Sequence, residues 1–173
     1  MEATLDQSYL LSVMETLINT PSPVSYYEEV NPLLEKLAGE LGYEVSFDRK
    51  RTGYIKVFGK DTTKTICVGA HLDTLGLMVR KIDKDGAIRV RNLGGINFNN
   101  IEGESVVVHT RDGKRYTGYV LCQSHSVHVF DDARTLARDE NSMMVLLDED
   151  VHSEKEVKDL GIQHGDIISL EPH

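Results

Sequence analysis

The chain of 173 residues has few cysteines, no long apolar run and fewer basic than acidic residues. Its two cysteines lie in apolar, strand-like segments, which does not resemble a disulfide framework and favours a reducing cytoplasm. No apolar run approaches the roughly 20 residues that span a bilayer, and the acidic start is unlike a signal peptide, so no membrane association is expected. The net charge of −9 argues against nucleic acid as a partner, because phosphate binding depends on Lys and Arg.

Common signatures of nucleophilic and nucleotide chemistry are also missing. The sequence contains no G-x-S-x-G elbow and no G-x-G-x-x-G loop. Cys67 is expected to be an inert core residue of a buried strand. Acidic pairs such as Glu28 and Glu29 are expected on a solvated helix face. Nucleophilic catalysis therefore finds no support.

What the chain does have is the composition of a globular protein, with 40% hydrophobic and 27% charged residues. Apolar residues at helical spacing predict one helix that ends before Pro21 and a second that ends at Gly42. The second helix has two possible starts. Ser25 and Glu28 match a capping box, which would leave Pro32 to kink the helix. Alternatively, Asn31 is the N-cap and Pro32 the first helical residue.

From residue 43 onward the pattern predicts strands. Segments 43–47 and 54–58 indicate a hairpin, and the continuous apolar run 66–70 is typical of a strand buried on both faces. Together with the helices, they predict the opening of an α/β layer. Short strands follow at even spacing and predict a small barrel or sandwich, at 77–79, 88–90, 106–108, 119–121, 143–147 and 166–170. Segment 123–142 is predicted to be a long loop, and Ser153 to begin a short helix.

His71 and Asp73 follow the buried run 66–70 directly. Residues two apart on a strand face the same side, so their side chains are expected to project together. Histidine is the commonest metal ligand, and a nearby carboxylate can hold its tautomer and orientation. A metal site and a hydrogen-bonded strand end both explain this spacing.

A second group of possible ligands lies in the long loop, where His125 and His128 precede Asp131 and Asp132. This group could hold a transition metal, but a solvated polar loop is the favoured interpretation, because flexible loops make poor frames for metal ligands. His109 is expected at the end of a strand.

Four stretches together resemble one enzyme family. They are "TPSPVSYYEEV" (20–30), "AHLDTLGLMVRKIDKDGAIRVRNLGG" (70–95), "HTRDGK" (109–114) and "SEKEVKDLGIQHGDIISLEP" (153–172). The set is similar to the tetrahedral-type metalloaminopeptidases, which include glutamyl and deblocking aminopeptidases and some members labelled endoglucanase. The resemblance covers nearly the whole chain.

The resemblance implies an incomplete α/β zinc-peptidase-like catalytic domain with an inserted small all-β barrel used for dimerisation. Residues 1–76 would be the N-terminal part of the catalytic domain, 77–165 the inserted barrel, and 166–173 a strand returning toward the second half of the catalytic domain.

The resemblance also implies a site and a reaction. His71 would bind one metal of a co-catalytic pair, and Asp73 would be the catalytic-site carboxylate that orients His71. Two divalent ions (zinc, cobalt or manganese) would catalyse the hydrolysis that removes N-terminal residues from peptides. The family's dimers build toward tetrahedral dodecamers, in which a loop such as 123–142 can approach a neighbour's active site.

The sequence departs from the family pattern because the remaining metal ligands and the general base belong to a second half that has no counterpart here. The chain alone is therefore expected to be inactive, as a fragment or as a short product that needs a partner chain. A non-catalytic oligomerisation or binding scaffold is the alternative. Glycoside hydrolysis is a third reading, but no pair of carboxylates flanking a sugar site is identifiable.

Overall fold

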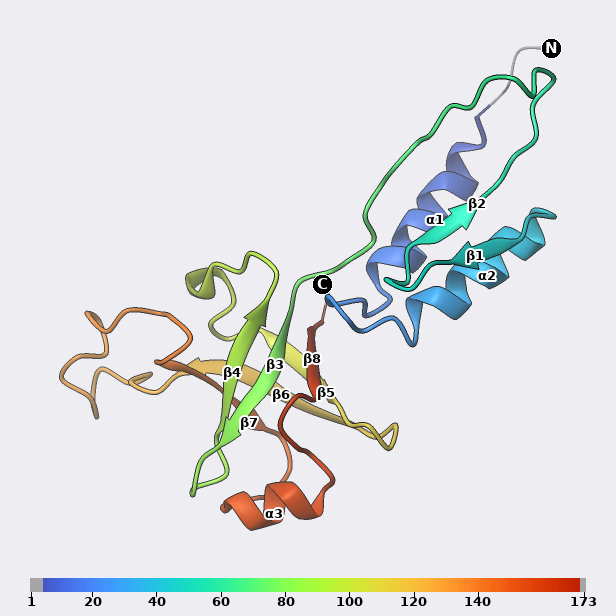
Figure 1. Cartoon of the computed structure of the whole chain (residues 1–173). Helices are drawn as coiled ribbons and strands as arrows, with labels where there is room; N and C mark the ends of the chain where they lie inside the picture. The colour runs from blue at the N-terminus through green and yellow to red at the C-terminus, as the bar shows by residue number, and fades with distance from the viewer. Residues whose placement is uncertain (1–4, 172–173) are drawn as a thin grey trace. The chain divides into compact units, whose positions relative to one another are not determined.

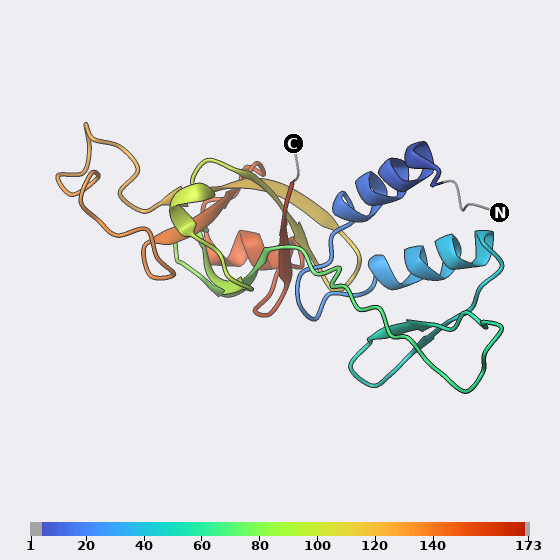
Figure 2. The same cartoon turned by 90° about the horizontal axis from the view of Figure 1, so that it is seen from above.

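The computed structural model describes residues 5–171, which divide into two units after Asp73. The first unit holds two helices, α1 (Gln7–Ile18) and α2 (Val30–Glu40), and a hairpin of β1 (Val45–Phe47) and β2 (Gly53–Ile55) (Figure 1). In Figure 2, α2 lies between α1 and the hairpin. Among residues 5–171, no helix has the length and apolar character needed to cross a bilayer.

Helix α1 confirms the first predicted helix. The Asp6 side chain caps it by accepting a hydrogen bond of 3.0 Å from the backbone N–H of Tyr9, which satisfies one of the unpaired donors of the first turn. No residue of α1 is buried, although its sequence carries an apolar stripe. The stripe therefore lacks the packing that normally stabilises an amphipathic helix.

Helix α2 begins at Val30 and so matches neither predicted start. Glu29 precedes it without a side-chain capping bond, and Asn31 is the second helical residue instead of the N-cap. Pro32 does not kink the helix, because the N–H groups of the first turn have no partner within the helix in any case. Gly42 follows the helix with a φ of +79°, the left-handed conformation predicted for it.

The predicted buried strand at 66–70 is wrong in this structure. The segment is extended, but no strand among residues 5–171 pairs with it, and the side chains of Ile66 and Val68 are 89% and 91% exposed. Cys67 is also exposed and is not the core residue expected. A strand needs a neighbour to bind its backbone groups, and apolar sequence alone does not supply one. The second hairpin strand is likewise short, ending at Ile55 instead of continuing to residue 58.

The second unit is a closed barrel of six antiparallel strands in the order β3-β4-β7-β6-β5-β8, with β8 returning to β3 (Figure 1). This closure confirms the predicted barrel and removes exposed strand edges. The strands are β3 (Gly76–Ile82), β4 (Ile88–Leu93), β5 (Ser105–His109), β6 (Arg115–Cys122), β7 (Met143–Leu147) and β8 (Ile167–Leu170). A 3₁₀ turn (Phe98–Asn100) precedes β5.

The barrel has a dense apolar interior. Leu77, Ile88, Val108, Val120 and Ile168 are completely buried, each from a different strand. The inward positions alternate with outward ones along β6, as a barrel with one filled interior requires.

Helix α3 (Glu154–Asp159) lies between β7 and β8 in the chain, and its Val157 joins the buried core. Ser153 caps it as predicted, since its hydroxyl accepts from the backbone N–H of Glu156 at 3.3 Å.

The last strand, β8, pairs with both β3 and β5 and so closes the barrel. The return of residues 166–173 toward the second half of the catalytic domain stays a prediction. The barrel needs this strand because β3 and β5 would otherwise each present an open edge. The division between the units falls after Asp73, three residues before the expected boundary at 76. Residues 172–173 lie outside the described part of the chain.

Candidate functional site

His71 and Asp73 lie close together, as their spacing predicted. The Nδ1 atom of His71 is 3.0 Å from an Oδ1 atom of Asp73. The His71 side chain is 84% exposed and that of Asp73 47% exposed. The contact occupies one ring nitrogen and leaves Nε2 available to a ligand, which is the arrangement by which a carboxylate orients a metal-binding histidine.

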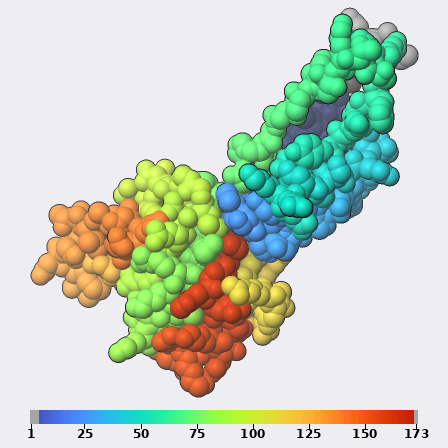
Figure 3. All heavy atoms as spheres, viewed as in Figure 1, coloured from blue at the N-terminus to red at the C-terminus, as the bar shows by residue number. Residues whose placement is uncertain are grey.

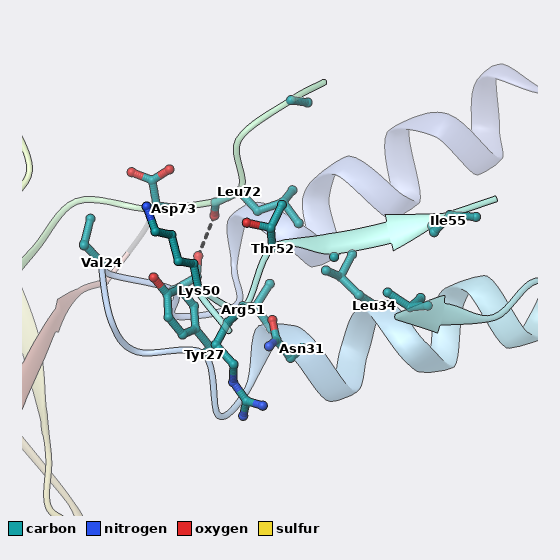
Figure 4. Close-up of a pocket in the computed structure, with 15 residues that line it drawn as sticks. Val24, Tyr27, Asn31, Leu34, Lys50, Arg51, Thr52, Ile55, Leu72 and Asp73 are labelled. Atoms are coloured by element: carbon teal, nitrogen blue, oxygen red, sulfur yellow. Dashed lines mark hydrogen bonds between the residues drawn. The ribbon is translucent and has the colours of Figure 1, made fainter. Parts of the chain in front are cut away.

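The residue between them ties this segment to the rest of the first unit. The hydroxyl of Ser22, which is buried, donates a hydrogen bond of 2.6 Å to the carbonyl oxygen of Leu72. Figure 4 shows this bond as a dashed line beside Asp73. The bond fixes the extended chain at the position from which His71 and Asp73 project.

A hollow of about 530 Å³ opens beside this segment, entirely within the first unit. Its walls are mainly apolar, with Leu34, Ile55 and Leu72 among the lining residues. Figure 4 shows these side chains coming from α2, the hairpin and the extended segment. Lys50 and Asp73 line the same hollow, so it carries both signs of charge.

The hairpin turn beside the hollow is held by one carboxylate. Asp48 accepts hydrogen bonds from the backbone N–H groups of Thr52 at 2.9 Å and Lys50 at 2.8 Å. The Thr52 bond has the largest effect, and together these bonds lower the pKa of Asp48 below its ordinary value. Arg51 sits in this turn with a φ of +67°, an uncommon conformation for a non-glycine residue. The turn is thus a fixed wall of the hollow.

Asn31, predicted from the sequence only as a possible helix cap, has a different place in the structure. It is 7% exposed, lines the hollow, and its Nδ2 atom has no hydrogen-bond acceptor among residues 5–171. A buried amide without a partner is costly, so this donor is a place where an acceptor is needed. The signal in the sequence was an amide at helical spacing with Leu34 and Ala38 on the buried face of α2.

The described residues do not make up a complete metal site. No group of three or more His, Cys, Asp or Glu side chains converges within residues 5–171. A catalytic zinc site uses three protein ligands and a water molecule, whereas this chain brings one histidine and its orienting carboxylate together. His71 and Asp73 therefore fit one ligand of a metal and its support, and no more.

The loop histidines do not form the alternative metal cluster. His125 contacts the backbone carbonyl oxygen of Cys122 through Nδ1 at 3.2 Å, and its ring packs against Phe130 with the centroids 5.6 Å apart. His128, Asp131 and Asp132 do not gather around it as a ligand group. The reason is that His125 is already held within its own loop, by the Cys122 carbonyl oxygen and by the ring of Phe130.

Arg138 holds the loop Gln123–Ser142 to the barrel. Its guanidinium pairs with Glu102 at 2.8 Å and donates to the carbonyl oxygens of Ala133 and Leu136 at 2.9 and 2.8 Å. The pair is mostly buried, with side chains 17% and 27% exposed. The hydrogen bond from Arg138 to Glu102 has the largest effect on the guanidinium and raises the pKa of Arg138. This partly buried ion pair is thus one anchor of a long loop without regular structure, and Arg91 of β4 provides another by pairing with Glu140 at 2.7 Å.

Comparison with known proteins gives this site a context. The sequence pattern of the M42 glutamyl aminopeptidases matches residues 53–173. YhfE of Bacillus subtilis (strain 168), which carries an aminopeptidase designation, is 37% identical over 162 residues, covering 94% of this chain and 47% of the relative. The chain therefore spans about half the length of this relative.

Solved structures agree on the fold. The TET aminopeptidase of the marine sediment archaeon Thaumarchaeota archaeon SCGC AB-539-E09 has a TM-score of 0.81 at 24% identity, covering 96% of this chain and 46% of that one. The TET1 peptidase of Pyrococcus horikoshii, which can assemble into a tetrahedron or a large octahedral shell, has a TM-score of 0.74 at 18% identity. That comparison covers 95% of this chain and 47% of the other.

Proposed function

Because the chain belongs to the M42 glutamyl aminopeptidase family, we propose that it is part of a metal-dependent aminopeptidase that releases N-terminal residues from peptides. In this proposal His71 is a metal ligand and Asp73 is the carboxylate that orients it. The observation that carries the proposal is the contact of 3.0 Å between His71 Nδ1 and Asp73 Oδ1 on an exposed segment. This contact selects Nε2 as the ligating atom.

The complete site would hold two divalent ions, with zinc, cobalt and manganese as the candidates. A single imidazole ligand does not discriminate among these metals. The other ligands would have to come from residues beyond those described, because one histidine is fewer than even one catalytic metal uses. The chain alone is therefore proposed to be inactive toward peptides.

The barrel is proposed to be the dimerisation domain of this enzyme, inserted into the catalytic domain. Its support is that the barrel is complete, with a closed ring of strands and a buried core, while the first unit is not. The similar solved structures include a peptidase that can assemble into a tetrahedron or a large octahedral shell, which supports homo-oligomers and, by extension, a tetrahedral dodecamer. The two free cysteines support a cytoplasmic location.

One observation favours a second candidate function. A closed barrel, in a chain whose described residues contain no converging metal-ligand group, is also what a non-catalytic oligomerisation scaffold would show. The two functions differ in whether His71 matters. A scaffold would keep its assembly and its role when His71 is removed, whereas an aminopeptidase would lose turnover.

A covalent chimera tests the enzymatic proposal directly. Residues 5–171 of this chain would replace the matching part of YhfE, to which the chain is 37% identical. We expect the chimera, with added zinc, cobalt or manganese, to hydrolyse an aminoacyl-anilide, and His71→Ala to reduce kcat/KM by at least about 10²-fold, as expected when a ligand is lost. The unmodified chain should show no turnover with the same metals.

His152→Ala provides the matched control. His152 and Asp150 form a second exposed His–Asp pair two residues apart, with a distance of 2.9 Å, on the barrel unit. This substitution should leave kcat/KM within about twofold of the parent chimera. Equal losses in the two variants, or turnover by the unmodified chain that survives His71→Ala, would refute the assigned role of His71.

A further inference from the structure

A second hollow, of about 620 Å³, lies entirely within the barrel unit. The 3₁₀ turn contributes Asn99 to its wall, and the loop 123–142 contributes the other lining residues, among them Arg134 and Arg138. Figure 3 shows this loop (orange) standing out from the barrel. The lining is mainly polar, in contrast to the apolar lining of the hollow beside Asp73, so it suits a ligand that forms hydrogen bonds.

Arg138 forms a fixed part of the wall. Its Nε and Nη2 atoms donate to Glu102 at 2.8 and 3.4 Å, and its Nη1 atom donates to the carbonyl oxygens of Ala133 and Leu136. These contacts use four of the five N–H groups of the guanidinium. One N–H group on Nη2 therefore has no acceptor among residues 5–171.

Arg134 and Asn99 bring further unused donors to the hollow. Arg134 is exposed, and its guanidinium makes no hydrogen bond or ion pair within residues 5–171. The Asn99 amide donates one N–H to Asn97 Oδ1 at 3.0 Å and keeps a second one. Three lining side chains therefore point to a ligand that accepts hydrogen bonds.

Acceptors and negative charge are scarce in the same hollow. No Asp or Glu side chain of the described residues lines it. The carbonyl oxygens of the lining residues Ala133 and Leu136 already accept from Arg138. Asp139, in the same loop, uses Oδ1 to accept from the backbone N–H groups of Asn141 and Ser142 at 2.7 and 3.2 Å. Since Glu102 offsets the charge of Arg138, Arg134 is the lining charge without a carboxylate partner.

We propose that this hollow binds the carboxylate of a small acid or of a peptide terminus, attached to a short aliphatic body. The planar guanidinium of Arg134 matches a carboxylate through two parallel N–H···O bonds, and Arg138 and Asn99 supply the remaining donors. Val127 and Ala137, which also line the hollow, contact the aliphatic body. The inference involves neither His71 nor a metal, so its failure would leave the proposed function standing.

Titration of the 173-residue chain with N-acetyl-alanylalanine, followed by backbone amide chemical shifts, tests the inference. We expect saturable shifts at amides around the hollow. The C-terminal amide of the same dipeptide should bind at least tenfold more weakly, because it lacks the charge. Arg134→Gln should weaken binding of the acid by at least tenfold, and Arg134→Lys by less, because lysine keeps the charge and loses the planar fork.

Arg49→Gln is the matched control. Arg49 is an exposed arginine of the first unit without a hydrogen bond or ion pair within residues 5–171, so binding should stay within about twofold of the parent chain. Acetate in place of the dipeptide distinguishes the two sources of the carboxylate. Equal affinity assigns the hollow to a small acid, whereas tighter binding of the dipeptide assigns it to a peptide terminus, and both results support the inference.

Four results would overturn the inference. They are the absence of saturable shifts up to about 50 mM dipeptide, equal binding of the acid and its amide, inorganic phosphate binding at least as tightly as the dipeptide, and equal weakening by Arg134→Gln and Arg49→Gln. A fall in self-association of the ligand-free chain on Arg134→Gln, measured by analytical ultracentrifugation, would instead assign Arg134 to an acidic side chain of a second copy and also overturn it.

Discussion

Gly118 is the position in the barrel where a single methyl group should do the most damage. It lies on β6 opposite Leu147 of β7. A Cβ atom there would be 3.1 Å from both the carbonyl carbon of Leu146 and the Cα of Leu147, and nearer still to the carbonyl oxygen of Leu146. All three atoms belong to the backbone, so no side-chain rotation relieves the contact.

The expected cost follows from how far the two strands must separate. Ordinary contact with the Leu146 carbonyl oxygen would require β6 and β7 to move apart by about 1 Å or more, which stretches nearby ladder bonds beyond the roughly 2.7–3.2 Å range of good hydrogen bonds. Weakening two such bonds at about 1 kcal/mol each, with some loss of core packing, gives a destabilisation of about 2–4 kcal/mol. For a unit of this size, that corresponds to a fall in Tm of roughly 10–25 °C.

Thermal unfolding followed by near-UV circular dichroism would measure this effect, because tyrosines on β6 report on barrel packing. Gly95→Ala is the control, since a Cβ at Gly95 meets nothing within 4 Å among the described atoms. It should change Tm by no more than about 2 °C. If Gly118→Ala unfolds at the same temperature as Gly95→Ala, the close approach of β6 and β7 is wrong.

Two further predictions concern the barrel. Burial has the largest effect on Asp166 and raises the pKa of its carboxyl above the ordinary 3.8, while the Gln163 amide and Arg111 partly oppose it. The folded state therefore loses stability relative to the unfolded state as pH rises from about 3.8 through the folded pKa. Asp166→Asn should gain in urea stability over the parent across that range, and a pH-independent difference would contradict this. Arg138→Ala should speed limited proteolysis of Gln123–Ser142 about tenfold, because it removes the Glu102 pair. Arg134→Ala is the control for this experiment. If both variants are cleaved at the same rate, Arg138 does not order the loop.

The His71–Asp73 pair was predictable because it is local. Residues two apart in an extended chain face the same side whatever surrounds them. The sequence was therefore enough to place the Nδ1 atom of His71 near the carboxylate of Asp73. The hollow and the unpaired amide of Asn31 were not predictable. They arise where α2, the hairpin and the extended segment pack together. The spacing of residues within one element does not predict how separate elements pack.

Strand segments show the same division between local and nonlocal causes. Alternating apolar residues and turn sequences determined the barrel strands, and the Ser153 cap determined where α3 begins, since each depends on near neighbours. Only the tertiary structure decided that β8 closes the barrel and that 66–70 remains unpaired. A strand exists when another strand binds its backbone, and that partner is specified by the fold around it, not by the strand's own residues.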